Sequence, residues 1–406
     1  MAHDLFPVRV LYVSHNSIDT ALVRSQVLPY LRGLAIDGHD VGLVTFERGK
    51  PAGVHDLARD AGWAPIAWTW VPASPGSHLL AKVIDALRGV GMILWLVLRR
   101  RINVLHARSY LPAAMSWVAG KLTRRPYVFD MRGFLGQEYV DARYWGAGDF
   151  RYRLVQWAEK RLLRDAAEII VLTDAAADRL RNDPQYERWV DRRPVTVIPC
   201  AVDLSRFRPL PRRALQPTLV YSGSLGMWYL LDEMLRVYTF AREHVPGLRI
   251  LILNRHEQAL ITSAIERLGI DPSHVEIRVA DFSEMPKVLG AAHVAIALLR
   301  QVPSKIGSSP IKIAEYLACG LPTVVNAHLG DSDALIRRYG AGHVVDNFTE
   351  VNLRRAGAAV AGLIDNELAR RGARRLAEDV YSLDAAVRRY GQVYARLGRR
   401  AAIRGS

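Results

Sequence analysis

The sequence predicts an α/β protein built from two doubly wound domains in tandem. Short apolar and β-branched runs alternate with helical stretches along most of the chain. Uninterrupted apolar strands separated by amphipathic helices are typical of a parallel sheet covered on both faces. A length of 406 residues also favours two or three domains over one.

The first domain is expected over residues 1–206. One helix is predicted over 21–36, where apolar residues recur at helical spacing, and Pro29 inside it is expected to kink it. The predicted strands of this domain are 8–14, 40–46, 102–107, 126–131, 168–173 and 195–199.

A stretch rich in Pro and Arg, residues 207–218, interrupts this rhythm and predicts a linker. The alternation then restarts, so a second domain is expected over 207–375. A tail rich in Ala, Arg and Leu, residues 376–406, is expected to be helical and to pack back towards the first domain. The predicted strands of the second domain are 218–223, 248–253, 275–280, 293–299, 322–327 and 342–346.

The charge balance favours anionic partners. Lys and Arg number 55 against 40 Asp and Glu, which gives a formal net charge of +15. Nucleotides, nucleic acid and an acidic membrane surface all fit this charge. A specific nucleic-acid role is disfavoured because no basic stripe is interleaved with aromatic residues.

Composition also bears on the compartment. The only cysteines, Cys200 and Cys319, have no metal-ligand spacing, so we expect no zinc site and a reducing, cytoplasmic location. The first residues carry no basic segment of the kind that begins a signal peptide. Segment 90–101 is apolar but too short to span a bilayer, so at most it touches the inner face of the membrane.

Open α/β sheets bind ligands at the carboxyl ends of their strands, so two such domains facing one another predict an interdomain cleft. No GxGxxG follows a predicted strand and no GxxxxGK[ST] occurs, which disfavours a dinucleotide dehydrogenase and a P-loop NTPase. The candidate site residues are therefore those just past each strand, which include Ser14 to Ser17, Arg108, Asp130 to Gly133, Thr173, Ser222 to Gly226, Asn254 to His256 and Ala280 to Phe282.

The segment SSPIKIAEYLACG predicts a helix with Ser309 as N-cap, Pro310 at its first position and Gly320 as its stop. Lys312 falls in the first turn, which is unfavourable for a cation unless an anion binds there. Glu315 faces the same way and is placed to accept hydrogen bonds from a ribose. The pair predicts a binding site for a nucleoside diphosphate. The alternative is that the two side chains form an ion pair on the protein surface.

Four segments carry a resemblance to a known family: LAIDGHDVGLVT, VIPCAVDLSRFRP, YSGSLG and SPIKIAEYLACGLPTVV. In this order, over nearly the whole chain, the sequence resembles retaining glycosyltransferases of the GT4 class, also called the glycosyl transferases group 1 family. The resemblance implies the GT-B fold, with two Rossmann-like domains facing a cleft. It also implies a nucleotide-sugar donor on the C-terminal domain, an acceptor on the N-terminal domain, and no metal or other cofactor.

The resemblance supplies candidate site residues, with Glu315 on the ribose hydroxyls and Ser17 near the diphosphate. The donor site is expected at Ser17, Ser222, Gly223, Ser224, Ser308, Ser309, Pro310, Ile311, Lys312 and Glu315. The nucleobase region is expected at Asn254, Arg255, Asp281 and Phe282, and the acceptor side at Arg108, Asp130, Gly133 and Glu138.

The chain departs from the family pattern at three places. Gly307 stands where many members have a first glutamate, and Ser224 and Tyr229 stand where a common Arg and Lys neutralise the diphosphate. Lys312 is therefore the predicted replacement cation, with Lys305 second. Arg132 falls where many members carry a histidine.

Arg132 cannot act as a base, but its planar guanidinium suits an anion. Arg132 and Lys312 are the predicted catalytic residues, stabilising charge on the leaving diphosphate. The alternative for Arg132 is a structural pair with Asp130.

The expected function is a retaining, hexosyl-type transfer from a UDP- or GDP-linked sugar to a saccharide or lipid-linked acceptor in polysaccharide or glycolipid biosynthesis. An anionic membrane surface is a further expected partner. Two alternatives stay open: a non-catalytic nucleotide- or sugar-binding protein on the same fold, and a nucleotide-sugar epimerase.

Overall fold

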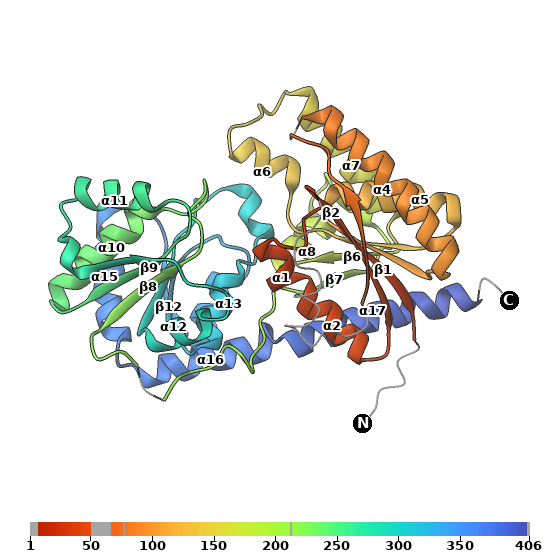
Figure 1. Cartoon of the computed structure of the whole chain (residues 1–406). Coiled ribbons are helices and arrows are strands. Elements are labelled where there is room, and N and C mark those ends of the chain that lie inside the picture. Colours follow the sequence, from red (N-terminus) through yellow and green to blue (C-terminus); the bar gives the residue numbers. More distant parts are fainter. Residues whose placement is uncertain (1–6, 50–65, 77, 212, 404–406) are drawn as a thin grey trace. The chain divides into compact units, whose positions relative to one another are not determined.

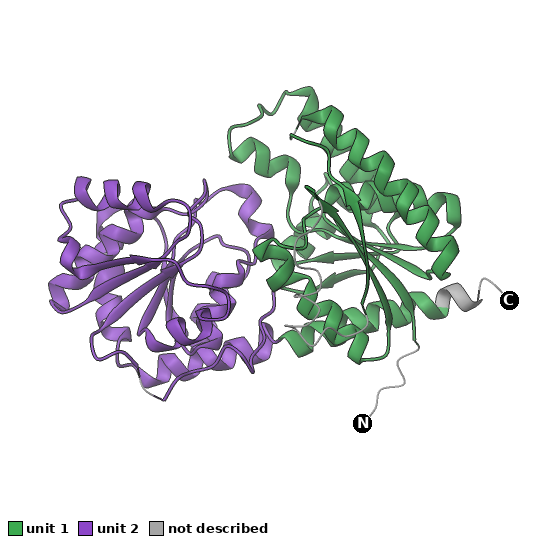
Figure 2. Cartoon of the chain, in the orientation of Figure 1, with its two compact units in different colours: residues 1–199, 383–406 green, residues 200–382 purple. Residues whose placement is uncertain are grey.

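The computed structural model describes residues 7–49, 66–76, 78–211 and 213–403 (Figure 1). The chain divides into two compact units (Figure 2). Unit 1 comprises residues 1–199 and 383–406, and unit 2 comprises residues 200–382. The crossing into unit 2 falls at Cys200, seven residues before the expected boundary at 207.

Unit 1 contains a seven-stranded sheet in the order β3-β2-β1-β4-β5-β6-β7, with every pairing parallel. In the centre, Val10 of β1 pairs with Val41 on one side and Val104 on the other. The strands are β1 (Arg9–Ser14), β2 (Asp40–Glu47), β3 (Ala67–Pro72), β4 (Val104–Arg108), β5 (Tyr127–Asp130), β6 (Glu168–Val171) and β7 (Val195–Val197).

Most helices of unit 1 lie in the chain between one parallel strand and the next, as in a doubly wound sheet, whereas α17 follows unit 2 in the chain. In chain order they are α1 (Ala21–Gln26), α2 (Leu28–Ile36), α4 (Leu79–Arg100), α5 (Tyr110–Thr123), α6 (Leu135–Asp141), α7 (Phe150–Asp165), α8 (Asp174–Asn182), α9 (Glu187–Val190) and α17 (Leu383–Ile403).

Two local features of unit 1 differ from the expectation. The helix predicted over 21–36 is two helices, because Val27 leaves helical geometry and Pro29 falls in the first turn of α2. Proline is favoured in a first turn, so it begins a new helix here instead of only kinking one. Strand β3, which the pattern did not predict, is a half-buried edge strand with little apolar alternation.

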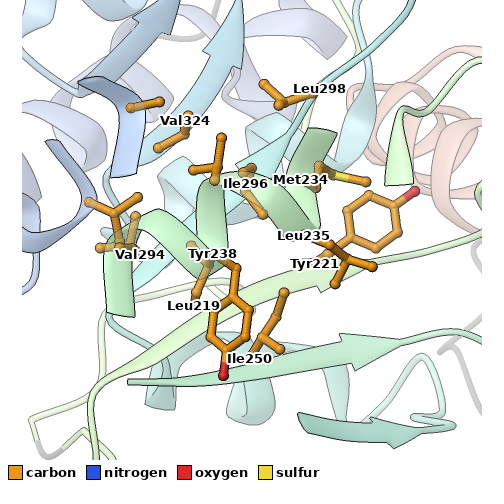
Figure 3. Packing of buried hydrophobic residues seen from close by; sticks show 14 of the residues in the cluster. Leu219, Tyr221, Met234, Leu235, Tyr238, Ile250, Val294, Ile296, Leu298 and Val324 are labelled. Atoms are coloured by element: carbon orange, nitrogen blue, oxygen red, sulfur yellow. The ribbon is translucent and has the colours of Figure 1, made fainter. Parts of the chain in front are cut away.

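Unit 2 contains a six-stranded parallel sheet in the order β10-β9-β8-β11-β12-β13. Its core packs the buried faces of these strands against α10, with Tyr238 among the largest fully buried side chains (Figure 3). The strands are β8 (Thr218–Ser222), β9 (Arg249–Leu253), β10 (Val275–Arg278), β11 (Val294–Ala297), β12 (Thr323–Asn326) and β13 (Gly342–Val345).

Helices again link the strands of unit 2. The α-helices are α10 (Leu231–His244), α11 (Gln258–Arg267), α12 (Met285–Ala291), α13 (Ile311–Ala318), α14 (Ser332–Tyr339), α15 (Glu350–Leu363) and α16 (Glu367–Val380). Two 3-10 turns, η1 (Pro272–His274) and η2 (Pro303–Gly307), complete the described elements.

The stretch predicted as a linker, 207–218, packs on unit 2. Phe207 is buried in its core, and the side chain of Leu210 lies against Gly290. The backbone N–H of Ala214 donates to the carbonyl of Ala291 at 2.9 Å. The linker prediction was therefore wrong, because the prolines here break regular structure without freeing the chain from the core.

The C-terminal tail belongs to both units. Helix α16, which begins before the predicted tail, packs on α13 and α14 in unit 2, whereas α17 packs on α2 in unit 1. The crossing back falls at Leu383, where residue 376 had been expected. Aromatic rings anchor α17, with Tyr390 edge-on to Tyr30 at 5.6 Å between centroids.

Each sheet reverses its strand order at one point, between β1 and β4 in unit 1 and between β8 and β11 in unit 2. Ligands of open α/β sheets bind at the carboxyl ends of the strands that flank such a point. The residues that follow Ser14 and Arg108 in unit 1, and Ser222 in unit 2, are therefore the candidates for ligand binding.

Candidate functional site

The loop after β8 is held in one conformation by two side chains of the loop after β9. Gly223 has φ of +98°, which glycine adopts without strain. Asn254 Nδ2 donates to the Gly223 carbonyl at 3.2 Å and to Glu257 Oε2 at 2.6 Å. Glu257 Oε1 in turn accepts from the backbone N–H groups of Leu225 and Gly226. Asn254 was predicted to lie in the nucleobase region. Its side-chain amide instead holds the loop after β8.

Helix α13 is tied to the same strand end through Tyr316. The hydroxyl of this fully buried side chain accepts from the backbone N–H of Ser222 at 2.7 Å and lies 3.0 Å from Ser222 Oγ. Burial raises the pKa of Tyr316, so its hydroxyl stays neutral. This contact fixes Lys312, one turn earlier on α13, against the loop at Gly223.

Lys312 is buried within a cage of aromatic groups. Its Nζ lies 3.5 Å from the ring centroid of Tyr229 and 4.2 Å from that of Tyr221, and it donates to Tyr221 Oη at 2.8 Å. A Cβ added to Gly223 would meet this Nζ at 3.1 Å. Aromatic faces stabilise a cation, yet burial lowers the pKa of Lys312 well below its ordinary value.

Glu315 lies near Lys312, and the side chains of both residues are only 9% exposed. Burial raises the pKa of Glu315 to about 7, although Lys312 and Arg206 both act to lower it. Among the described residues, none donates a hydrogen bond to this carboxylate or approaches it as an ion pair within 4.0 Å. The surface ion pair considered from the sequence is therefore not what the structure contains.

The start of α13 differs from the prediction. The helix begins at Ile311 with Pro310 in the N-cap position, so Ser309 is not the cap. Ser309 Oγ accepts from the backbone N–H of Cys200 at 3.2 Å instead. Among the described residues no side chain caps the first turn, and Gly320, with φ of +69°, ends the helix as predicted.

A second lysine and an arginine flank this pair. Lys305 is buried in η2 with its Nζ 3.7 Å from the centroid of the Trp228 ring. Arg206, which the sequence analysis did not select, has its guanidinium 3.9 Å from the Phe282 ring centroid and donates to the Phe282 carbonyl. Its charge acts on Glu315, so Arg206 links the predicted base region to the carboxylate.

The remaining predicted residues of unit 2 lie around this centre. Ser224 is exposed, Ser308 half-buried and Gly307 buried. Arg255 Nη2 and Asp281 Oδ1 form an exposed ion pair at 2.8 Å. The structure thus brings together Ser222, Gly223, Lys312 and Glu315, while the Arg255–Asp281 pair faces solvent.

In unit 1, the predicted acceptor residues surround a fully buried carboxylate, that of Asp130 at the end of β5. Arg132 Nη1 lies 3.2 Å from Asp130 Oδ1, and Arg108 Nη1 lies 3.8 Å from Oδ2. His106 Nε2 is 3.4 Å from Oδ2. Burial alone would raise the pKa of Asp130, but Arg132, His106 and Arg108 hold it well below its usual value.

The Asp130 cluster extends to the C-terminal helix. Tyr394 Oη of α17 lies 2.9 Å from His106 Nδ1, so the imidazole is bound on both sides. Burial lowers the pKa of His106, which keeps the ring neutral, although Asp130 opposes this shift. The Asp130–Arg132 pair is present, and a catalytic role for Arg132 stays a prediction. Only knowledge of the fold could have found Tyr394.

The loop after β1 is held by Glu47 at the end of β2. Ser17 Oγ donates to this carboxylate, as do the Ile18 N–H at 2.9 Å and Thr45 Oγ1 at 2.5 Å. The sequence analysis named Ser17 but missed Glu47, which is 2% exposed.

A histidine and a carboxylate also meet beside this loop. His15 Nε2 lies 2.9 Å from Asp85 Oδ2 of α4, and Asp85 Oδ1 accepts from the Ser74 N–H at 2.8 Å. Burial lowers the pKa of His15, although its contact with Asp85 opposes this shift. Seventy positions separate the two residues in the sequence, which explains why no local pattern revealed them.

Gly133 and Glu138 lie at the start of α6. Gly133 has φ of +151°, and its carbonyl accepts from Tyr110 Oη at 3.0 Å. A Cβ added there would meet Glu138 Oε1 at 2.8 Å, so glycine allows the glutamate to approach the backbone.

The described part of the chain contains neither a metal-binding cluster nor a membrane-spanning helix. No cluster of three or more His, Cys, Asp or Glu side chains in residues 7–49, 66–76, 78–211 and 213–403 is arranged to hold a metal ion. Over the same residues, no helix combines the length and apolarity that a membrane span needs.

Comparison with known proteins gives one family match and several structures of the same fold. Residues 23–201 match the family model of the glycosyl transferase 4-like domain. Sucrose-phosphate synthase from Thermosynechococcus elongatus superposes with a TM-score of 0.74 at 18% identity, over 96% of this chain and 99% of that one. A search of curated proteins finds no match.

Two further solved structures agree over the whole chain. A glycosyltransferase from Rickettsia africae gives a TM-score of 0.70 at 15% identity, covering 96% of this chain and 98% of that one. HepE of Anabaena in complex with UDP gives 0.69 at 12% identity, covering 96% and 100%. The fold is therefore GT-B. The match to the glycosyl transferase 4-like domain, residues 23–201, falls almost wholly within unit 1.

Proposed function

We propose that this protein is a retaining glycosyltransferase that moves a hexosyl group from a nucleoside-diphosphate sugar to a saccharide or lipid-linked acceptor. The product would serve polysaccharide or glycolipid biosynthesis, with the enzyme lying peripherally on an anionic membrane surface. The observation that carries the proposal is the buried carboxylate of Glu315, which has no hydrogen-bond or ion-pair partner among the described residues, beside the caged ammonium of Lys312.

Buried charged groups are normally paired, because an uncompensated one is costly. A nucleoside diphosphate supplies what each group lacks: phosphate oxygens for Lys312 and the free amides at the start of α13, and ribose hydroxyls as donors to Glu315. Lys312 lies against the ring of Tyr229, which stands at the place of the family's lysine. The ammonium group of Lys312 therefore lies where the family's lysine would be, but it extends from α13 instead of from the loop after β8.

Departure of the sugar leaves negative charge on the diphosphate, and preorganised positive groups stabilise that charge. Lys312 and the N-terminus of α13 are the groups of unit 2 that supply it. Arg132 is proposed to assist from unit 1, held by Asp130. Transfer is proposed to proceed without a metal ion, as the resemblance implies.

The donor class has support from the neighbours. Structures of HepE contain UDP, UDP with glucose, and UDP-glucose, and the pneumococcal O-GlcNAc transferase GtfA was solved with UDP and GlcNAc. UDP is therefore the first ligand to test, with GDP second.

The test is a thermal-shift panel of UDP, GDP, ADP, CDP and dTDP with a chelator present. A ligand at a hundred times its dissociation constant adds about 2.7 kcal/mol, a shift of several degrees. We expect one diphosphate to stabilise the wild type but neither Glu315→Ala nor Lys312→Met. Matched controls are Glu266→Ala and Lys287→Met, which change exposed residues of α11 and α12 and should retain the full shift.

Measurements of turnover then distinguish the remaining hypotheses, which are a transferase, an epimerase and a non-catalytic protein. Transfer with retention predicts that sugar leaves the nucleotide only when an acceptor is present, and that NMR finds the donor's anomeric configuration in the product. Free sugar or nucleotide formed without acceptor would favour the epimerase. Absence of a shift with every diphosphate would instead favour a non-catalytic protein.

A further inference from the structure

Helix α4 exposes an apolar stripe on the side opposite its buried face. Ile93, Leu96 and Val97 are buried, whereas Leu87 is 69% and Leu98 76% exposed. The outward apolar residues recur at helical spacing in two groups on one side of the helix, separated by the exposed Gly91: Leu80, Val83 and Leu87, then Trp95 and Leu98. A helix that is apolar on both faces is unusual on a protein surface that only meets water.

Two neighbouring helices of unit 1 extend this stripe. Helix α5 packs against both α4 and α7, and the three lie together in the orange and yellow part of Figure 1. We call their outward face the α4–α5–α7 surface. Helix α5 adds Val118 and Leu122, and α7 adds Phe150, Leu154 and Trp157, all exposed. Contiguous exposed apolar groups of this kind indicate an interaction site.

The charges on the same surface are nearly all positive. The acidic residues of α4, α5 and α7 are Asp85 and Glu159, which are buried, and Asp165, which pairs with Lys121 and Arg164. Asp149, the N-cap of α7, pairs with Arg151. The exposed basic residues of these helices and of their C-terminal ends include Arg88, Arg99, Arg100, Arg101, Lys121, Arg124, Arg151 and Arg153.

Two exposed tryptophans carry arginines over their rings. Arg99 Cζ lies 5.4 Å from the ring centroid of Trp95, and Arg161 Cζ lies 5.4 Å from that of Trp157. Tryptophan favours the boundary between headgroups and acyl chains, and arginine binds phosphate. A second copy of this chain would bring the same positive charges against one another, whereas an anionic membrane complements both the stripe and the charge.

We propose that the α4–α5–α7 surface docks on an anionic phospholipid membrane, with its leucine and tryptophan side chains entering the acyl boundary and its arginines binding lipid phosphates. If the protein is the proposed glycosyltransferase, this docking means that its acceptor is lipid-linked and is taken from the same membrane. That consequence rests on the proposed function. The α4–α5–α7 surface widens the membrane segment expected from the sequence, 90–101, to three helices.

The test is flotation of the full chain with vesicles of phosphatidylcholine alone or of equal parts phosphatidylcholine and phosphatidylglycerol, at low and high salt. We expect binding only with phosphatidylglycerol and at low salt. Leu87→Gln with Leu98→Gln should lower partition by about tenfold or more, since each leucine buries several methylene groups. Arg99→Gln with Arg100→Gln should lower it by about fivefold per arginine.

Matched controls remove equally exposed residues of unit 2. Leu260→Gln with Leu368→Gln removes two leucines that are 56% and 80% exposed, and Arg355→Gln removes an exposed arginine. These variants should float like the wild type. Loss of flotation in the controls to the same extent would overturn the assignment to the α4–α5–α7 surface.

A thermal shift with UDP, measured on the same proteins, separates this inference from the proposed function. Wild type that shifts with UDP but does not float at low salt overturns the docking surface and the peripheral membrane location, and leaves the proposed sugar transfer standing. Flotation without any nucleotide shift overturns the proposed function alone. A dimer that dissociates on Leu87→Gln with Leu98→Gln would also overturn the proposal, because the stripe would then be an interface between copies.

Discussion

Two buried carboxylates, one in each unit, have opposite surroundings and opposite pKa shifts. Asp130 of unit 1 has Arg132, Arg108 and His106 around it, and its pKa is held well below the usual value. Glu315 of unit 2 is also buried, but no described residue donates to it, and burial raises its pKa to about 7. Among the described residues, Asp130 therefore has ion-pair partners, and Glu315 has no hydrogen-bond or ion-pair partner.

The difference distinguishes architecture from a binding site. A buried charge with three partners contributes a fixed geometry, which here holds the ends of β4 and β5 and the helix α17 together. A buried charge without partners costs free energy until something binds. We therefore expect changes at Asp130 to act on stability, and changes at Glu315 to act on ligand binding.

The largest expected effect is at Asp130. Asp130→Ala removes the carboxylate that faces the buried Arg108 and the partly buried Arg132, and should destabilise unit 1 by about 4 kcal/mol. Of the nine tryptophans only Trp228 lies outside residues 1–199, so tryptophan fluorescence during urea unfolding reports on unit 1. Asp178→Ala, at an exposed position of α8, is the control. A loss below about 1 kcal/mol would contradict the architectural role.

A smaller effect of opposite sign is expected at Glu315. The native carboxyl, with its pKa raised to about 7, keeps a proton that the unfolded chain loses near 4.5. The cost of ionising it therefore appears as pH rises from about 4.5 to 7 and is complete above that. Glu315→Gln should stabilise the unliganded protein by about 2 kcal/mol at pH 8, with no gain near pH 4.5.

Calorimetry of the wild type and Glu315→Gln across this pH range checks the sign. The same variant should lose the shift with UDP, so stability and binding change in opposite directions. A gain in stability that did not depend on pH would show that the raised pKa is not its cause.

The smallest effect is expected at the hydroxyl that completes the Asp130 cluster. Tyr394→Phe removes the bond to His106 Nδ1 and should cost about 1 kcal/mol in unit 1. Tyr390→Phe is the matched control, since Tyr390 packs by its ring and no described group is bonded to its hydroxyl. Equal losses in both variants would mean that ring packing, and not the hydrogen bond, is being measured.

The fold could be predicted from the sequence wherever a strand is buried on both faces. Strands such as β1 and β12 read as continuous apolar runs, and their positions were predicted to within about two residues. β3 was missed because its edge position leaves it half-buried and removes that signal. The residues 207–218 were misread because proline marks a break in regular structure, not separation from a core.

The candidate site was predictable only in its local part. Lys312 and Glu315 stand out because two charges interrupt an apolar helix. Ser309 was misassigned because its hydroxyl is taken by the backbone of Cys200, 109 positions away. Arg206, Glu47 and the His15–Asp85 pair depend on contacts between elements distant in sequence, and no periodicity encodes those contacts.

Because α17 belongs to unit 1, the chain leaves that unit at residue 199 and returns at residue 383. During synthesis, unit 2 is therefore whole before the segment that supplies Tyr390 and Tyr394 has left the ribosome. Domains generally fold in the order in which they are made. Unit 1 begins first in the chain but is completed last, so α2 and β4 lack their contacts with α17 in the nascent chain until that helix has been made.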